Sequence, residues 1–510
     1  MNAGADSGTR TGNLNSPGHL PGNGNGELCA RVLRLCDATE PMLPPGPAVD
    51  AVAAVRQRLG ERTLRIAVGG RMNAGKSTLV NALLGRRLAA TAATECTMLV
   101  AWFRRGVQNR VEVRRADGRV YHVPSAPGGG IPRDPARLGS PREEIEEIVV
   151  EVTDSLGADD YTLVDTPGMD TLSGLDEVAM RALAQADALL YVMPHPGTGD
   201  AEALQALRMK ADARMTALNV VGVLSRVDEL GSGVGDPWPG ARRVAATYTR
   251  RLTGMVTEVV PVAGLLAQTA MGDEFTERDT ALVRRLAASD SVALDRALYS
   301  PDDFLRWADG PLSADQRQRV FTLLGRYGIA TAVAAVSSGV PGTRALLGEL
   351  RRASGIDPLL DHMGRRFVYA ADRLRAAAAL GVLETGAAAG QAPPAAWPGL
   401  DALRAGIDAV RRHPLMRQQE LATALADLAG ERLALSEPDV ASLVTLATGA
   451  TAPACLGLAP GSTPAALSAA AAEQAAHWRR LEFTAPSRPA QRHARTAREL
   501  CEAFVFDARH

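Results

Sequence analysis

The residues best suited to chemistry lie in a glycine-rich turn within the stretch LRIAVGGRMNAGKSTLVNALLG. The turn fits the pattern G-x-x-x-x-G-K-[ST] and separates an apolar run from a helix-like segment. In this arrangement backbone N–H groups and the positive end of the helix face phosphate oxygens. The residues expected to bind a nucleotide phosphate chain are Gly70, Asn73, Ala74, Gly75, Lys76, Ser77 and Thr78.

The lysine in this turn stands out against the rest of the chain. Only two of the 56 basic residues are lysines, Lys76 and Lys210, and all the others are arginines. A coincidental match to the pattern would be expected to carry arginine at position 76. We expect Lys76 to bridge the β- and γ-phosphates and the Ser77 hydroxyl to bind Mg²⁺.

A second motif, Asp165-Thr-Pro-Gly168, follows the apolar run YTLV and fits D-x-x-G. We expect Asp165 to hold a Mg²⁺-bound water and the Gly168 N–H to contact the γ-phosphate. A threonine between the two motifs should close over the metal and the γ-phosphate. The candidates are Thr91, Thr94 and Thr97, and we choose Thr97 because it directly precedes the next predicted strand.

A third motif, Ser225-Arg226-Val-Asp228, ends another apolar run. Guanine-binding proteins use [NT]-K-x-D here, because the carboxylate accepts from guanine N1–H and the 2-amino group. Adenine presents an acceptor at N1 and would be repelled. Ala263-Gly264 follows a further apolar run, where a backbone N–H can meet guanine O6. The motifs therefore predict GTP and GDP as ligands, with Mg²⁺.

Composition limits the other classes of function. The net charge is −1 and aromatic residues make up 4% of the chain, so neither a basic field nor stacking platforms for nucleic acid are predicted. The five cysteines are scattered without a C-x-x-C, which indicates a reducing compartment. We find no signal peptide and no run of 18 apolar residues, so we expect no spanning helix, although binding to a membrane surface stays open.

Apolar runs alternate with helix-like segments from Leu64 onward. Several runs are apolar throughout, which is typical of strands buried on both faces of a mainly parallel sheet. After about residue 275 only helical periodicity is left. The predicted strands are 64–69, 98–104, 110–115, 147–153, 161–165, 188–193, 219–225 and 257–262.

The predicted fold class is an α/β P-loop GTPase domain, with a mainly parallel sheet and inserted strands, joined to an α-helical bundle. The inserted strands follow from the separation of Lys76 and Asp165, which is much longer than a minimal Ras-like core needs. We expect residues 1–26 to be disordered, because they are rich in Gly, Asn, Ser and Pro. Helical spacing in 27–61 assigns that segment to the helical part of the protein.

With GRMNAGKSTLVNALLG, a long insert, DTPG and an [ST]-[KR]-x-D strand, the chain resembles the bacterial dynamin-like GTPases. The stretches ATECTMLVAWFRRG, SRVDELGSG and RYGIATAV resemble the actinobacterial isoniazid-inducible (IniA/IniC-type) branch. The resemblance implies a GTPase head at 62–275, and a helical neck and trunk built from 27–61 and 276–510. It also implies hydrolysis of GTP to GDP and phosphate, with Lys76, Thr97 and Asn73 as catalytic residues. Asn73 stands where eukaryotic dynamins have a catalytic serine.

Further expectations concern partners and place. The resemblance implies self-association through the heads, a paralogous dynamin-like partner, and membrane remodelling by fission, fusion or tethering. The protein is expected in the cytoplasm, peripheral to the inner face of the cell membrane. For the membrane contact we choose the uncharged loop 452–461, with Leu456 and Leu458, over 327–340. The alternatives are an Era-like GTPase serving RNA or ribosome assembly, and a nucleotide-gated scaffold without membrane activity.

Overall fold

The computed structural model describes most of the chain from Gly26 to Asp507. Residues 1–25, for which disorder was predicted together with Gly26, lie outside the described part. The three candidate threonines, Thr91, Thr94 and Thr97, also lie outside it. The described residues are 26–61, 63–89, 99–126, 128–132, 134–153, 161–168, 179–180, 182–183, 185–194, 197–210, 218–230, 236–388, 397–429, 433 and 435–507.

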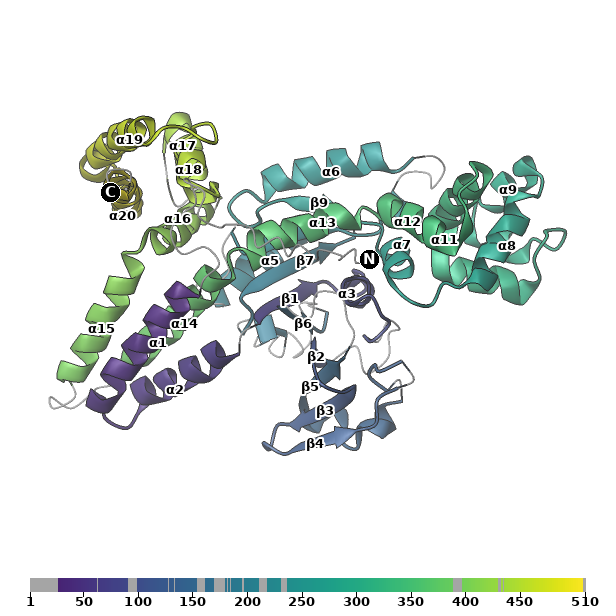
Figure 1. The fold of residues 1–510 in the computed structure, drawn as a ribbon, viewed down its shortest axis with the longest axis horizontal. Helices are drawn as coiled ribbons and strands as arrows, with labels where there is room; N and C mark the ends of the chain where they lie inside the picture. Colours follow the sequence, from purple (N-terminus) through teal and green to yellow (C-terminus); the bar gives the residue numbers. More distant parts are fainter. Residues whose placement is uncertain are drawn as a thin grey trace, which may run out of the picture.

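A nine-stranded sheet lies at the centre of the molecule (Figure 1). Its strands are β1 Leu64–Gly70, β2 Val100–Arg105, β3 Arg110–Arg115, β4 Val120–Val123, β5 Ile145–Val152, β6 Tyr161–Asp165, β7 Ala188–Met193, β8 Val220–Leu224 and β9 Val259–Pro261. Their order in the sheet is β4-β3-β5-β2-β6-β1-β7-β8-β9. From β6 to β9 all neighbours are parallel, whereas β2 is antiparallel to β6, and β3 is antiparallel to both β5 and β4.

The predicted mainly parallel sheet with inserted strands is confirmed. Every residue of β6, β7 and β8 is buried, as expected for apolar runs covered on both faces. Each predicted strand is present: 110–115, 161–165 and 188–193 match at both ends, and the ends of the others differ by at most two residues. Strand β4 was not predicted, because its four residues alternate between exposed and half-buried positions and carry no apolar run.

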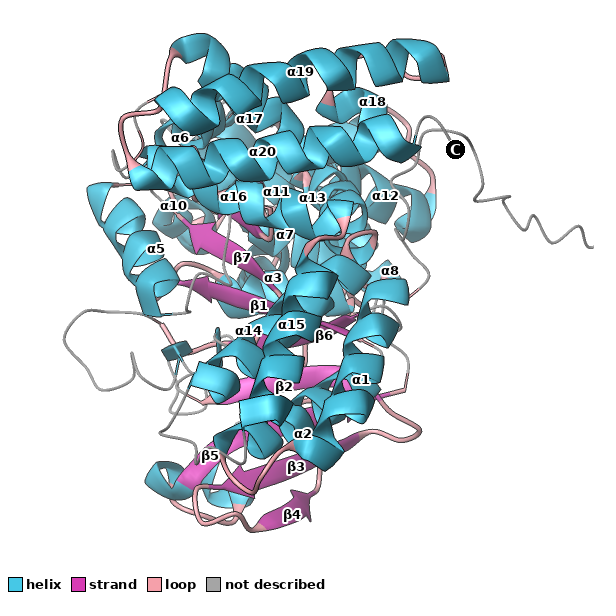
Figure 2. Cartoon of the chain, turned by 90° about the vertical axis from the view of Figure 1, so that its left-hand side faces the viewer, coloured by secondary structure: helices cyan, strands magenta, loops and turns pink. Residues whose placement is uncertain are grey.

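Helices cover both faces of the sheet and form most of the described chain outside it (Figure 2). In order they are α1 Glu27–Thr39, α2 Pro47–Gly60, α3 Lys76–Leu84, α5 Thr198–Lys210, α6 Trp238–Arg251, α7 Gly264–Met271, α8 Glu277–Ala287, α9 Ser291–Ala297, α10 Pro301–Arg306, α11 Ala314–Ser337, α12 Gly342–Ser354, α13 Ile356–Met363, α14 Ala371–Ala388, α15 Trp397–Arg411, α16 Pro414–Ala429, α17 Glu437–Thr448, α18 Ala452–Cys455, α19 Pro464–Thr484 and α20 Arg488–Asp507.

The buried apolar side chains divide into three clusters. One contains residues of α1, α2 and α14 through α20, and is the core of the helical bundle. The other two lie on the two faces of the sheet, and they include residues of α7 through α13. The boundary expected between residues 275 and 276 therefore falls inside a shared core, and the domain limits stay a prediction.

Helix α1 is capped from far along the chain. The Asp372 carboxylate, at the start of α14, accepts hydrogen bonds from Leu28 N at 2.8 Å and Cys29 N at 2.9 Å. The N-cap position, Gly26, has no side chain that could do this. A carboxylate at a helix N-terminus satisfies open N–H groups and opposes the helix dipole. Asp372 thus fixes α1 against α14 within the bundle.

Helix α11 is, by length and composition, the one described helix that could cross a membrane. It is broken at Gly325, whose φ of 61° and ψ of −176° are not helical. The pieces 314–324 and 326–337 are each shorter than the roughly 20 residues that a membrane span requires. Ile329, Ala332 and Leu324 are buried in the head, so α11 is a packed helix of the fold.

The segment 452–461 does not present the leucines that were expected to contact lipid. Residues 452–455 form α18, and Leu456 is only 6% exposed within the bundle core. Leu458 is partly buried against the same core. The prediction that both leucines project from a loop tip is therefore wrong, because this short Pro- and Gly-flanked segment folds back onto α16 and α17.

Candidate nucleotide-binding site

The phosphate-binding turn connects β1 to α3 and has the backbone that the glycine pattern predicts. Gly70 has φ 143°, and a Cβ there would lie 2.3 Å from the carbonyl oxygen of Val192 in the neighbouring strand. Gly75 has φ 93° and precedes α3, which has no side-chain cap. Asn73 also has positive φ, 58°. The turn can approach β7 closely, and the first N–H groups of α3 are available to an anion.

Lys76 and Ser77 begin α3 and point to the carboxyl end of the sheet. Lys76 is 8% exposed, and its Nζ donates to the carbonyl of Arg71 at 2.9 Å. This hydrogen bond holds the ammonium group against the turn. Ser77 Oγ donates to Asp165 Oδ2 at 2.7 Å. Because β6 is parallel to β1, with Asp165 opposite Val68, Asp165 emerges beside the turn.

The environment of Asp165 fits a divalent cation. Burial raises the pKa of Asp165 to about 6, although the Ser77 hydrogen bond and the Lys76 charge oppose the rise. Its Oδ1 is buried and has no hydrogen-bond partner among the described residues. Mg²⁺ prefers oxygen ligands and commonly takes only one or two from protein, with phosphate and water completing the shell. Ser77 and Asp165 are the residues that would hold it; Thr97 lies outside the described residues.

Gly168 lies directly against the turn. A Cβ at this position would be 2.7 Å from Met72 Cα and 2.9 Å from Met72 N. Only glycine can therefore occupy this site without moving one of the two backbones. The arrangement brings the D-x-x-G motif and the phosphate-binding turn into contact, as the sequence predicts.

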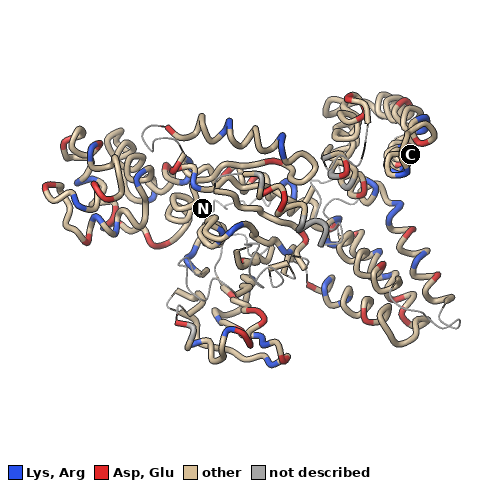
Figure 3. The backbone as a smooth tube through the Cα atoms, turned by 180° about the vertical axis from the view of Figure 1, so that it is seen from behind, with Lys and Arg blue, Asp and Glu red and all other residues tan. Residues whose placement is uncertain are grey.

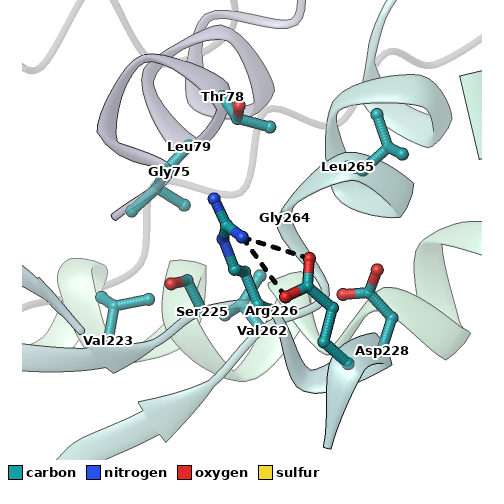
Figure 4. Close-up of a pocket in the computed structure, with 11 residues that line it drawn as sticks. Gly75, Thr78, Leu79, Val223, Ser225, Arg226, Asp228, Val262, Gly264 and Leu265 are labelled. Atoms are coloured by element: carbon teal, nitrogen blue, oxygen red, sulfur yellow. Dashed lines mark hydrogen bonds and ion pairs between the residues drawn. The ribbon is translucent and has the colours of Figure 1, made fainter. Parts of the chain in front are cut away.

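A pocket of about 230 Å³ opens between α3, the end of β8 and the start of α7 (Figure 4). Among the described residues it is lined by Gly75, Thr78, Leu79, Val223, Ser225, Arg226, Asp228, Glu229, Val262, Gly264 and Leu265. It thus joins the phosphate-binding turn to the motif predicted to recognise guanine. Burial raises the pKa of the Asp228 carboxyl, and the charge of Arg226 opposes that rise.

Ser225 and Arg226 connect the pocket to the turn. Ser225 Oγ donates to Ala74 O at 2.7 Å, and Arg226 Nη2 donates to Asn73 O at 2.8 Å. Both Asn73 and Arg226 have positive φ, which is uncommon outside glycine. Ser225 and Arg226, which stand in place of the usual [NT]-K pair, therefore connect the loop after β8 to the phosphate-binding turn.

The third predicted loop contributes Gly264 rather than Ala263. The Ala263 N–H donates to the carbonyl of Ser354 at 2.9 Å, and the side chain is buried outside the pocket. Gly264 starts α7 and lines the pocket with Leu265. Leu265 and Glu229 were not predicted, because each is an ordinary neighbour of a motif residue and carries no signal of its own.

Charges of both signs are interspersed over the molecule (Figure 3). The basic positions on the C-terminal helices are largely matched by acids, as in the pairing of Glu482 with Arg495 and Arg498. An RNA-binding module of the kind that the Era-like alternative requires would be expected to carry a one-sided basic surface. This distribution does not favour that alternative.

Comparison with known proteins agrees with the site. Residues 66–227 match the model of the dynamin family. The isoniazid-induced protein IniC of Mycobacterium tuberculosis is 35% identical over 475 residues, which cover 89% of this chain and 93% of that protein. A bacterial dynamin-like protein of Nostoc punctiforme is 23% identical over 28% of this chain and 22% of its own length. A solved structure of an oligomerised bacterial dynamin pair covers 83% of this chain and 79% of its own, at 14% identity and a TM-score of 0.32.

Proposed function

Because the chain belongs to the dynamin family, in the group of the isoniazid-induced protein IniC, we propose that it is a Mg²⁺-dependent GTPase. In this proposal hydrolysis of GTP to GDP and phosphate is coupled to self-association of the heads and to membrane binding and remodelling. The observation that carries it is the contact between Ser77 and Asp165 beside a pocket lined by Asp228. These residues would serve the metal, the phosphates and the base at one edge of the sheet.

In the proposed reaction the protein positions the nucleotide and neutralises charge. Mg²⁺, when bound, would stabilise charge on the phosphate oxygens. Lys76 is held over the turn by Arg71, from where its ammonium can reach the β- and γ-phosphates. N–H groups of the turn and of Gly168 would bind the oxygens that gain charge in the transition state. The roles of Thr97 and Asn73 as further catalytic residues stay a prediction.

Base selection is proposed to come from Asp228. A carboxylate accepts the two donors on guanine and is repelled by the N1 acceptor of adenine. The Ser225 and Arg226 contacts to Ala74 and Asn73 would keep this carboxylate in register with the phosphate-binding turn. Loss of the base contact should therefore affect affinity without removing the phosphate contacts.

The membrane contact is proposed to lie at the tip of the bundle formed by α1, α2, α14 and α15. The α1–α2 connection and the start of α15 lie at the same end of this bundle, because a Cβ at Gly399 would be 2.3 Å from Met42 O. Met42 is 48% exposed and Trp397 57% exposed there. In Figure 1 this tip is far from α3 and α7. Tryptophan, with an apolar body and one polar atom, suits a lipid–water interface.

The test of the proposed function uses the full chain with Lys76→Ala as its reference. Wild type should bind a fluorescent GTP analogue, hydrolyse GTP with Mg²⁺, and co-sediment with liposomes in a nucleotide-dependent way. Lys76→Ala should lose nucleotide binding while its thermal melt stays near wild type. Unchanged affinity in the folded variant would overturn the role of Lys76.

The same assays separate the alternatives. A protein that binds GTP but neither hydrolyses it nor sediments with lipid would be the nucleotide-gated scaffold. Preferential binding to RNA over liposomes would indicate an Era-like GTPase that serves RNA or ribosome assembly. The cytoplasmic location at the inner face of the membrane and a paralogous partner belong to the proposal, and co-purification from a membrane fraction tests both.

A further inference from the structure

The break in α11 lies directly behind one wall of the base pocket. At Gly325, φ 61° and ψ −176° fall in a backbone region that is essentially restricted to glycine. Gly325 is buried, and a Cβ there would lie 3.4 Å from Leu265 Cδ2. Leu265 lines the pocket from α7 (Figure 4). A change in the path of α11 at this residue therefore acts first on Leu265.

Helices α7 and α11 are held together on both sides of the break. Before it, the Thr269 hydroxyl of α7 donates a hydrogen bond to the carbonyl of Leu323. After it, α11 approaches α7 so closely that a Cβ at Gly328 would be 2.9 Å from Leu266 Cδ1. The pocket wall thus has its position set by α11, which lies in a different part of the sequence.

The same segment of α11 also contacts the start of α6. Tyr327 OH accepts a hydrogen bond from Trp238 Nε1 at 2.8 Å and donates to Ala353 O at 3.3 Å. Trp238 is the first residue of α6, the helix that follows the Asp228 loop. Residues 323–328 therefore contact α7, which lines the pocket, and also α6 and the end of α12, which lie outside the pocket lining.

Arg326 adds a charge at this place. Its Nη1 donates to the Tyr299 carbonyl at 2.6 Å, which connects α11 to the turn between α9 and α10. Burial raises the pKa of the Asp228 carboxyl, and the charges of Arg226 and Arg326 oppose that rise. Arg326 thus favours the ionised form of the carboxylate, which is the form that accepts from guanine.

We propose that the Gly325 break is a specificity-determining part of the guanine site: it lets the lobe of α8–α11 (residues 277–337) support Leu265 without narrowing the base pocket. Gly325 acts through Leu265 and is a positioning residue. The inference rests on the proposed guanine-nucleotide function. It assigns to the helical lobe a part in nucleotide affinity and release that the sequence motifs alone do not contain.

The first experiment compares Gly325→Ala with wild type and with the matched control Gly348→Ala. Gly348 lies in α12, and a Cβ there meets nothing within 4 Å. Gly325→Ala should release fluorescent GDP about tenfold faster, the effect of about 1.4 kcal/mol. The loss of affinity should be equal for GDP and GTP, because the substitution does not affect the γ-phosphate contacts. It should be smaller for IDP, whose hypoxanthine lacks the 2-amino group that Asp228 would bind.

One further variant keeps the proposal testable if Gly325→Ala folds poorly. Thr269→Val keeps the shape of the side chain but removes the hydrogen bond to Leu323, and should speed GDP release several-fold.

The outcomes are distinct. If wild type binds no guanine nucleotide, the proposed function itself fails. If wild type binds GDP but Gly325→Ala and Thr269→Val release it at the wild-type rate, the function stands and this inference is overturned. A lower melting temperature with unchanged release in Thr269→Val would likewise overturn it, because a purely structural role moves only stability.

Discussion

Ser77 Oγ donates a 2.7 Å hydrogen bond to Asp165 Oδ2, joining the first turn of α3 to the end of β6, while Oδ1 of the same carboxylate stays buried without a partner in the described chain. A divalent cation that both residues bind would replace this hydrogen bond. The contact therefore indicates that the two side chains are already held at one site before a ligand arrives, which lowers the cost of ordering them on binding.

We predict that Ser77→Ala removes one oxygen from this site and weakens Mg²⁺-dependent binding of GTP more than binding of GDP in EDTA. The physical reason is that the hydroxyl serves the metal, whereas the turn N–H groups serve the phosphates. Titration calorimetry with each nucleotide, with Mg²⁺ and with EDTA, measures the difference. Thr78→Ser, which keeps a hydroxyl at the neighbouring position, is the control. Equal weakening under both conditions would contradict a role in metal binding.

For base selection, Asp228→Asn should weaken GTP and improve XTP. The amide presents a donor where the carboxylate presented an acceptor, and this suits the 2-carbonyl of xanthine. Breaking a contact to a buried charge costs on the order of 2–5 kcal/mol. Competition of GTP, XTP and ATP against a fluorescent analogue gives the three affinities. A wild-type protein that binds ATP as well as GTP would contradict the role of Asp228 in selecting guanine.

Lipid contact should depend on the bundle tip. Trp397→Asp combined with Met42→Asp should reduce liposome flotation several-fold, because two exposed apolar groups are replaced by charges. Phe483→Asp is a matched control, since Phe483 is 79% exposed but lies at the end of α19. The GTPase rate without lipid should stay at the wild-type value in both variants. Flotation that falls only in the Phe483 variant would move the contact to the α19–α20 hairpin.

Stability should fall as the pH is lowered through the range in which His362 titrates. Burial lowers the pKa of His362 from 6.5 to about 4, and Arg366 and Arg365 add to the shift. Glu258 Oε2 lies 3.3 Å from its Nδ1, but that carboxylate is 54% exposed and its charge is screened. Between pH 6.5 and 4 the unfolded chain binds a proton at this residue that the folded chain does not. The stability is therefore fully present above pH 6.5 and is lost on acidification, by up to about 3 kcal/mol.

Urea unfolding at pH 7 and pH 5 checks this prediction. His362→Gln should show a smaller loss between the two pH values than wild type, whatever its stability at pH 7. His122→Gln removes an exposed histidine of β4, and should keep the wild-type pH dependence. Parallel loss in wild type and His362→Gln would assign the acid sensitivity to other groups.

The sequence predicted the strands and the phosphate-binding turn well because their signals are local. Lys76, Asp165 and Asp228 each follow an apolar run, and the parallel arrangement brings such ends to one edge of the sheet. What was missed depends on partners far along the chain. Periodicity showed that α8 and α11 have a buried face, but not that Val283 and Leu324 pack on the head. Leu456 was predicted to be an exposed loop residue, but it is buried by bundle residues that lie far from it in the sequence.

The capping of α1 by Asp372 has a consequence for how the protein is made. The two partners of this hydrogen bond are 344 residues apart in the chain, so α1 and α2 leave the ribosome long before α14 exists. Until then Leu28, Val32 and Val52, which are fully buried in the finished bundle, have no permanent cover. Early helices in this position must stay unfolded, pair with each other or be held by a chaperone while the whole head is synthesised. Completion of the bundle is thus a late event, and a chain that stops before residue 371 leaves its first two helices without their core.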